Sequence, residues 1–220
     1  MEIDPTALLG GKYLAGRAAL IDPRRAGQPV FGTPPKSGTV YLTAADASGQ
    51  MVSYIQSNYM GFGSGIVVPG TGISLQDRGC GFRSKPGHAN SVGPRKRPFH
   101  TIIPGFATKG GQPLMSFGVM GGPMQAQGHV QMAVRVLLCG QNPQEASDAP
   151  RWQVMEGNWV AIEASMPSRT VDALRAKGHD IRVQPGWANQ GFGGAQLILR
   201  SEAGYVAGSD QRKDGLAIGY

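Results

Sequence analysis

Apolar and polar residues alternate along two neighbouring runs in the first third of the chain. VYLTAAD at 40–46 and MVSYIQSNY at 51–59 flank Asp46–Gly49, whose composition is typical of a tight turn. In the second run the residues that face one way are Met51, Ser53, Ile55 and Ser57. We therefore predict an antiparallel hairpin whose successive residues point to opposite faces.

Similar patterns predict most of the remaining elements. Apolar runs at 101–108 and 113–120 flank a Lys-Gly-Gly-Gln turn, 159–164 is a single strand, and 195–208 is a last hairpin. Helical spacing marks the ranges 5–25, 125–140, 143–150 and 168–178. Because strands come in antiparallel hairpins with helices between them, we predict an α+β fold rather than a series of βαβ units.

Glycine and proline change this picture locally. The 220 residues include 34 glycines and 16 prolines, about twice the average share, so tight turns should be common. Residues 22–37 contain four prolines and no periodicity, which predicts an irregular linker. Residues 61–87 are so rich in glycine that their backbone is expected to approach another group closely.

The formal net charge of +7 is concentrated in one segment. Against the single acid Asp77, that segment carries Arg78, Arg83, Lys85, Arg95, Lys96 and Arg97. A nucleic-acid site would interleave such charges with aromatic side chains or place them on a recognition helix. This run lies among glycine and proline, so we favour a solvated loop, or one that guides a small carboxylate ligand, over a nucleic-acid partner.

Several classes of protein are disfavoured by what the sequence lacks. No apolar stretch approaches 18 residues, so no membrane span is expected, and MEIDPTALLGG does not have the pattern of a signal peptide. Cys80 and Cys139 make neither a disulfide scaffold nor a cysteine cluster, and no paired-histidine metal motif occurs. We expect no metal and no cofactor, and the compartment stays open.

The boundary between the proline-rich segment and the first strand is a candidate site of chemistry. Thr39 follows Gly38 there, and a β-branched residue at the start of a strand is ordinary. The alternative is a nucleophile exposed by peptide cleavage, because a free α-amine on the same threonine could act as the base for its hydroxyl. The local sequence leaves both interpretations open.

From residue 39 to residue 220 the chain resembles the small subunit of the γ-glutamyltransferase family, a group of N-terminal nucleophile hydrolases. The blocks that support this occur in the family's order: TVYLTAADASG, SNYMGFGSGIVVPGTGISLQDRGCGF, GPRKRPFHTIIP, GVMGGPMQAQGHVQM and GSDQRKDGLAIGY. The resemblance implies an αββα sandwich. It also implies that residues 1–38 are the end of a large subunit and that residues 39–220 are the catalytic small-subunit portion.

The same resemblance implies a catalytic mechanism. Self-cleavage between Gly38 and Thr39 would release Thr39, which would then attack a γ-glutamyl carbonyl. Gly121 and Gly122 match the glycine pair whose backbone amides stabilise the oxyanion. That role is physically reasonable, because glycine allows close approach and the following helix presents its positive end.

The substrate-binding positions show both a match and three departures. Ser57 and Asn58 fall where the family holds the nucleophile and the substrate carboxylate. Gly81 replaces the aspartate that pairs with the substrate amino group, and Arg78 replaces a carboxamide or carboxylate. His100 and Thr101 replace paired serines. A guanidinium suits a carboxylate and repels an ammonium, so these changes favour a glutaryl-like or succinyl-like acyl group without a free amine.

Three functional hypotheses follow. The first is γ-glutamyltransferase-like transfer or hydrolysis at γ-glutamyl or glutaryl-like amide bonds, with a small-molecule substrate. The second is a glutaryl- or cephalosporin-type acylase that only hydrolyses. The third is an uncleaved fragment that is inactive without the missing large-subunit portion of the same precursor.

Overall fold

The computed structural model describes residues 11–20, 39–155, 157, 159–186 and 191–220. The chain divides into two compact units, residues 1–37 and 38–220. The described part of the first unit contains helix α2 (Gly11–Ala18), which lies within the helix predicted at 5–25. The described residues do not include residues 5–10 and 21–25 of that predicted helix. They also do not include the predicted linker at 22–37 or Gly38.

Two sheets lie face to face in the second unit. The first is the hairpin of β1 (Thr39–Ala45) and β2 (Met51–Ser57), in which Thr39 pairs with Ser57. The second sheet is antiparallel with strand order β3-β4-β8-β9, and its members are β3 (Gly105–Lys109), β4 (Gln112–Met120), β8 (Gly194–Ser201) and β9 (Gly204–Ser209). All three predicted hairpins are confirmed, and Met51, Ser53, Ile55 and Ser57 share the more buried face of β2.

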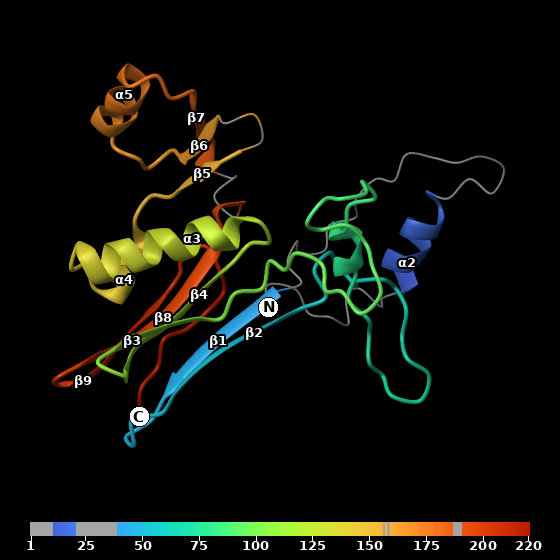
Figure 1. Cartoon of the computed structure of the whole chain (residues 1–220), viewed down its shortest axis with the longest axis horizontal. Coiled ribbons are helices and arrows are strands. Elements are labelled where there is room, and N and C mark those ends of the chain that lie inside the picture. The colour runs from blue at the N-terminus through green and yellow to red at the C-terminus, as the bar shows by residue number, and fades with distance from the viewer. Residues whose placement is uncertain (1–10, 21–38, 156, 158, 187–190) are drawn as a thin grey trace. The chain divides into compact units, whose positions relative to one another are not determined.

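Two helices cover the other face of the four-stranded sheet (Figure 1). Helix α3 (Met124–Ala133) continues as a π-helical segment, Val134–Leu138. Helix α4 (Pro143–Asp148) begins with a capping box in which Asn142 and Glu145 each bond the other's backbone amide. Both helices were predicted, and the layers in this unit run hairpin, sheet, helices.

Strand β4 is buried on both faces because it is the centre of this stack. The residues of the core cluster on the helix side are Met115, Phe117, Val119, Met132, Val136, Ala146, Ala195 and Leu197. On the opposite face Ser116 hydrogen-bonds Thr43, and the Tyr41 ring lies against Gly118. A Cβ atom at Gly118 would lie 2.4 Å from the Tyr41 ring, so the two sheets approach this closely only because residue 118 is glycine.

A third sheet corrects part of the sequence prediction. It contains β5 (Trp152–Val154), β6 (Val160–Glu163) and β7 (Ile181–Gln184), and α5 (Ser168–Ala176) connects the parallel pair β6 and β7. This single βαβ connection stands within a fold that is otherwise built from antiparallel hairpins. Strand β6 was predicted at 159–164, whereas β5 and β7 were not, because such short strands carry little periodicity and parallel pairing has no local signal.

The second predicted hairpin also starts later than expected. Strand β3 begins at Gly105, so the predicted stretch from Thr101 to Pro104 is not a strand. Side chains of α3 take both backbone groups of Ile103: the Gln125 side-chain oxygen accepts from its amide at 3.0 Å, and His129 Nε2 lies 2.7 Å from its carbonyl oxygen. Those groups are consequently not available for a ladder with β4.

Buried ion pairs attach the C-terminal segment to the core. Asp210 pairs with Arg151, and Arg212 bonds Glu163 at 2.6 Å, with all four side chains almost completely buried. Burial opposes the charge on Asp210, but Arg151 and the amides of Ala195 and Arg212 hold its pKa below the usual value. The charges therefore stay paired inside the fold.

The same network supports the segment before β8. Arg151 also donates to the Phe192 carbonyl oxygen at 3.1 Å, and Asp210 accepts from the Ala195 amide at 2.7 Å. Gly193, between these two points, packs against Gly121: a Cβ at Gly121 would lie 3.0 Å from the Gly193 Cα. No helix in the described part of the chain is long and apolar enough to cross a membrane.

The close contact between Tyr41 and Gly118 generates a prediction. Gly118→Ala forces the Tyr41 ring or the hairpin to move, so we expect the free energy of unfolding to fall by about 1–3 kcal/mol. Thermal or urea unfolding measures this. Gly191→Ala, where an added Cβ meets nothing within 4 Å, is the control and should change stability by less than about 0.5 kcal/mol.

Candidate functional site

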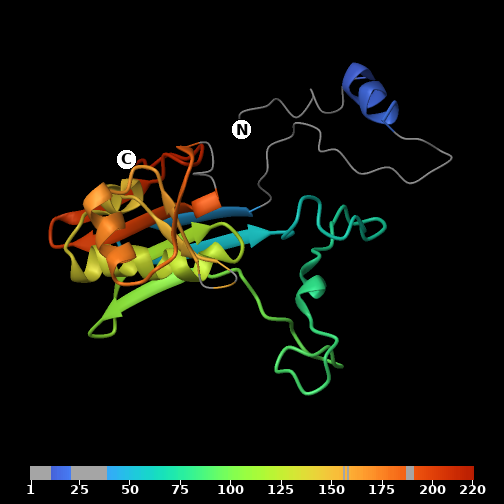
Figure 2. The same cartoon turned by 90° about the horizontal axis from the view of Figure 1, so that it is seen from above.

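Thr39 begins β1 and is held by its partner across the hairpin. Its hydroxyl donates to the Ser57 hydroxyl at 2.9 Å, and the Ser57 oxygen also accepts from the Tyr59 amide at 2.8 Å. Tyr59 has a φ of 78°, which is unusual for a residue other than glycine, so the chain turns sharply as it leaves β2. Ser57 thus links the predicted nucleophile to the start of the glycine-rich segment, which extends away from the sheets beyond the end of β2 (Figure 2).

Contacts between the sheets indicate where the first residues of β1 lie. Thr43 contacts Ser116, and Tyr41 contacts Gly118. A step of two residues toward the start of β1 therefore corresponds to a step of two residues toward the end of β4. If the same step is continued, it predicts that Thr39 faces Met120, the last residue of β4, which precedes the Gly121–Gly122 turn. Residues far apart in sequence are thereby directed to one end of the stacked sheets.

The glycine pair forms the turn between β4 and α3. Gly121 has a φ of 136° and Gly122 a φ of 58°, both in the region that favours glycine. Their carbonyl oxygens accept from the amides of Met124 and Gln125, in the first turn of α3, at 3.2 and 3.0 Å. The pair therefore lies at the helix N-terminus, where the backbone dipoles favour negative charge.

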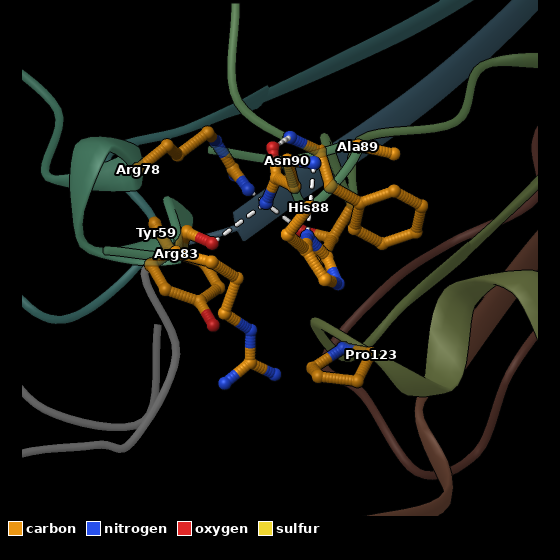
Figure 3. A pocket seen from close by; sticks show the side chains of 10 residues that line it. Tyr59, Arg78, Arg83, His88, Ala89, Asn90 and Pro123 are labelled. Atoms are coloured by element: carbon orange, nitrogen blue, oxygen red, sulfur yellow. Dashed lines mark hydrogen bonds between the residues drawn. The ribbon is translucent and has the colours of Figure 1, made fainter. Parts of the chain in front are cut away.

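A pocket of about 420 Å³ lies between the glycine-rich segment and the start of α3. Its lining residues are Tyr59, Arg78, Gly81, Arg83, His88, Ala89, Asn90, Phe99, Thr101 and Pro123. Figure 3 shows Arg78 on one side of the pocket and Pro123, which follows the glycine pair, on the other. The pocket thus brings three sequence-predicted residues, Arg78, Gly81 and Thr101, close to the glycine turn.

Arg78 is the most constrained charged side chain of this pocket. It is 4% exposed, its Nη1 donates to the Thr101 hydroxyl at 2.6 Å, and its guanidinium lies 4.9 Å from the centre of the Tyr59 ring. Its Nε is buried and has no hydrogen-bond partner among the described residues. Burial lowers the pKa of Arg78. None of the ten lining residues is Asp or Glu, so the pocket is cationic.

Three predicted substrate-binding residues, Ser57, Asn58 and His100, do not line this pocket. Asn58 accepts the Asp77 amide at 3.2 Å through its backbone oxygen. His100 is exposed, and its partial desolvation together with the charges of Arg78 and Arg97 lowers its pKa. Among the described residues, no group of three or more His, Cys, Asp or Glu side chains is placed to hold a metal ion.

Sequence reasoning missed residues that shape the pocket wall. Asn90 donates to the Gly81 carbonyl at 2.7 Å and accepts from the Phe99 amide at 2.8 Å, which joins two stretches of irregular chain. Tyr59 supports the Arg78 guanidinium. Neither role could be recognised from the local sequence. Asn90, for example, lies between alanine and serine, as an ordinary turn residue would. The charged run did signal Arg83, which also lines the pocket.

Comparison with known proteins places the fold in a class. Its structural neighbours have the fold of N-terminal nucleophile hydrolases, in agreement with the predicted fold class. The family model described as gamma-glutamyltranspeptidase matches residues 1–220. The chain belongs to this family of enzymes.

Individual relatives include acylases, amidohydrolases and transpeptidases. The crystal structure of the cephalosporin acylase from Bacillus halodurans is 48% identical with a TM-score of 0.75, covering 98% of this chain and 39% of that chain. The oxamate amidohydrolase proenzyme of Klebsiella pneumoniae is 35% identical over 100% of this chain and 42% of its own length. This chain spans about two fifths of the length of the curated relatives it matches.

A third relative matches a smaller share of this chain. The gamma-glutamyltranspeptidase from Pseudomonas nitroreducens complexed with L-DON is 26% identical with a TM-score of 0.69. The match covers 82% of this chain but 98% of that chain. The matched chain in that structure is therefore almost entirely accounted for by part of the present sequence.

Proposed function

We propose that this chain is the small-subunit-like portion of a precursor that hydrolyses or transfers acyl groups at amide bonds, with Thr39 as nucleophile. The observation that carries this proposal is the hydrogen bond between Thr39, the first residue of β1, and Ser57. From the contacts of Thr43 with Ser116 and of Tyr41 with Gly118 we infer that Thr39 faces the end of β4 that leads to Gly121 and Gly122. Relatives named as acylase, amidohydrolase and transpeptidase support chemistry at an amide bond.

Maturation would proceed by an acyl shift at the predicted cleavage point. The Thr39 hydroxyl attacks the Gly38 carbonyl carbon, the peptide C–N bond breaks, and the carbonyl is transferred to the Thr39 oxygen as an ester. Water then hydrolyses the ester, leaving a carboxyl group on Gly38 and a free α-amine on Thr39. Support comes from the word proenzyme in the name of the Klebsiella relative and from the matched chain of the Pseudomonas structure.

The mature residue would then carry out acyl transfer. The α-amine of Thr39 takes the hydroxyl proton as the oxygen attacks the substrate carbonyl carbon. Negative charge develops on the carbonyl oxygen, where the amides of Gly121 and Gly122 and the N-terminus of α3 stabilise it. The C–N bond breaks and the amine leaves with a proton. Water, or an acceptor amine in the transferase case, releases the acyl group from Thr39.

The pocket favours an acyl group that carries a carboxylate and no free amine. Arg78 and Arg83 supply positive charge, and none of the lining residues supplies a carboxylate for an ammonium group. Gly81, at the position where the family has an amine-binding aspartate, contributes only backbone to the pocket. A dicarboxylic monoamide such as a glutaryl amide satisfies these constraints better than a γ-glutamyl amide. Hydrolysis by an acylase is therefore the second candidate, favoured by the likeness to the cephalosporin acylase.

The third hypothesis, a fragment inactive by itself, is supported by one surface. The outer face of the β1–β2 hairpin exposes Val40, Leu42, Val52 and Tyr54, each by 45% or more. Since the curated relatives are more than twice as long as this chain, we propose that the remaining portion of the precursor covers this face. The whole active site then requires both portions.

Maturation is tested by mass spectrometry of the purified protein after incubation. We expect a species that begins at Thr39, and Thr39→Ala should abolish both this species and all amide hydrolysis by the assembled precursor. Thr39→Ser, which retains a hydroxyl, should still cleave, though more slowly. The proposal is wrong if cleavage occurs equally in Thr39→Ala.

Substrate preference is tested with glutaryl-anilide and γ-glutamyl-anilide on the assembled precursor. Arg78→Ala should lower kcat/KM for the glutaryl substrate about ten- to hundredfold, the usual loss for a charge-assisted hydrogen bond, and should affect the γ-glutamyl substrate less. Arg97→Ala removes the same charge from an exposed position outside the pocket and should leave the ratio unchanged. Equal losses on both substrates would refute the role of Arg78.

The covering portion is tested by adding the large-subunit portion to this chain and recording turnover. Activity should rise with the added portion and reach a plateau. Leu42→Lys, on the exposed hairpin face, should weaken this association at least tenfold because a charge is placed in an apolar contact. Val206→Lys, equally exposed on β9, is the matched control. Turnover by this chain alone would contradict the proposal.

A further inference from the structure

Helix α3 holds neighbouring chain segments through polar side chains that bond backbone groups in pairs. Gln127 accepts from the Val154 amide and donates to its carbonyl oxygen, at 2.7 and 3.1 Å. Gln131 does the same with Trp152, at 3.2 and 2.8 Å. These two residues attach the helix to β5. Each carboxamide therefore bonds the backbone of β5 as a neighbouring strand would, on the edge of β5 that does not pair with β6.

On another side of the same helix, Gln125 and His129 bind Ile103 in this way. The Gln125 side-chain oxygen accepts from the Ile103 amide at 3.0 Å, and His129 Nε2 lies 2.7 Å from the Ile103 carbonyl oxygen. His129 Nδ1 lies 2.6 Å from the Gln125 carbonyl oxygen. We call Gln125, His129 and Ile103 the Ile103 clamp.

The His129 ring is fixed by packing as well as by these bonds. It is buried, its centroid lies 5.4 Å from that of Phe117 in β4, and a Cβ at Gly105 would lie 3.0 Å from its Cδ2 atom. Burial lowers the pKa of His129 against the opposing effect of the two carbonyl contacts. A neutral ring with its proton on Nε2 donates to the Ile103 carbonyl oxygen and makes no hydrogen bond through Nδ1, so the link to Ile103 does not require a charged imidazole.

Ile103, the residue held by the clamp, is two positions along the chain from Thr101, which lines the pocket. Thr101, whose hydroxyl accepts from Arg78 at 2.6 Å, immediately precedes the Ile102–Ile103 step. Pro123, at the start of α3, lines the same pocket. The helix that begins at the glycine pair therefore also sets the position of the hydroxyl that orients Arg78.

We propose that His129 is a positioning residue for substrate selection: through Ile103 it holds Thr101, and through Thr101 it holds Arg78 in the geometry that receives the carboxylate of the acyl group. Gln125 assists by holding the Ile103 amide. The prediction for the acyl group rests on the proposed function, whereas the link from His129 to Arg78 does not.

Three variants separate positioning from a merely structural role. His129→Phe keeps an aromatic ring of similar size but loses the hydrogen bond to the Ile103 carbonyl oxygen. His129→Gln retains a donor for the Ile103 carbonyl, as Gln131 does for Trp152. Gln131→Leu breaks an equivalent clamp on the same helix that leads to β5 and away from the pocket, so it is the matched control for lost stability.

On the assembled precursor, His129→Phe should raise KM for glutaryl-anilide about tenfold, the loss expected for one buried hydrogen bond, with kcat within about twofold of wild type. His129→Gln should recover most of this loss. Gln131→Leu should lower the unfolding temperature without changing KM. An unchanged KM in His129→Phe, or an equal rise in Gln131→Leu, overturns the proposal.

A second measurement does not depend on turnover. In ¹⁵N NMR spectra of the 220-residue chain, the Arg78 Nε–H resonance should shift in His129→Phe and stay in place in Gln131→Leu, and glutarate should perturb it less in the first variant than in wild type. Absence of turnover by the wild-type assembled precursor, with this shift present, would refute the proposed function and support the clamp. Absence of the shift overturns the clamp.

Discussion

The contact between the Tyr41 ring and Gly118 sets the distance and register between the two facing sheets. Tyr41 is buried, its hydroxyl lies 2.7 Å from that of Ser53, and burial raises its pKa to about 12, so the side chain stays neutral between the layers. Any slip of the hairpin by one residue would turn Tyr41 outward and present its neighbours to Gly118. The placement of Thr39 relative to the end of β4 therefore depends on an aromatic ring seated on a glycine.

The glycine turn is supported from behind by a different kind of interaction. Gly193 packs on Gly121, and the backbone on both sides of Gly193 is bonded to the Arg151–Asp210 pair. Removing one member of a buried ion pair leaves an uncompensated charge, which makes such a pair costly to disturb. Apolar packing fixes the strand that carries Thr39, and buried charge fixes the segment behind the proposed oxyanion site. The two parts of that site are thus held by independent means.

The sequence predicted what depends on local pattern and missed what depends on tertiary contact. Alternating or apolar runs around turn residues predicted all three hairpins, and Gly140, with a φ of 70°, ends the segment that α3 begins, as expected. The strand at 181–184 was missed because its partner β6 precedes it in the chain by a whole helix, α5, so that no turn between neighbouring runs marks the pair. At the site, Arg78 was found from its position in a sequence motif. Asn90 was missed because its hydrogen bonds to Gly81 and Phe99 leave no pattern in the neighbouring sequence.

The residues proposed for catalysis and those proposed for substrate selection occupy physically distinct parts of this chain. Thr39, Gly121 and Gly122 lie at the ends of regular elements, whereas the pocket wall from Tyr59 to Thr101 has almost no regular structure beyond a single 3₁₀ turn at Arg78–Gly81. That wall is joined to the sheets at Ser57 and to α3 at Ile103. A loop tied at both ends can exchange its interior side chains without disturbing the strands that it connects. Such exchange would allow relatives with the same arrangement of sheets and helices to have names that specify substrates as different as oxamate and a cephalosporin. Selectivity would then change through residues such as Arg78 and Gly81, while the contacts that place the nucleophile stay the same.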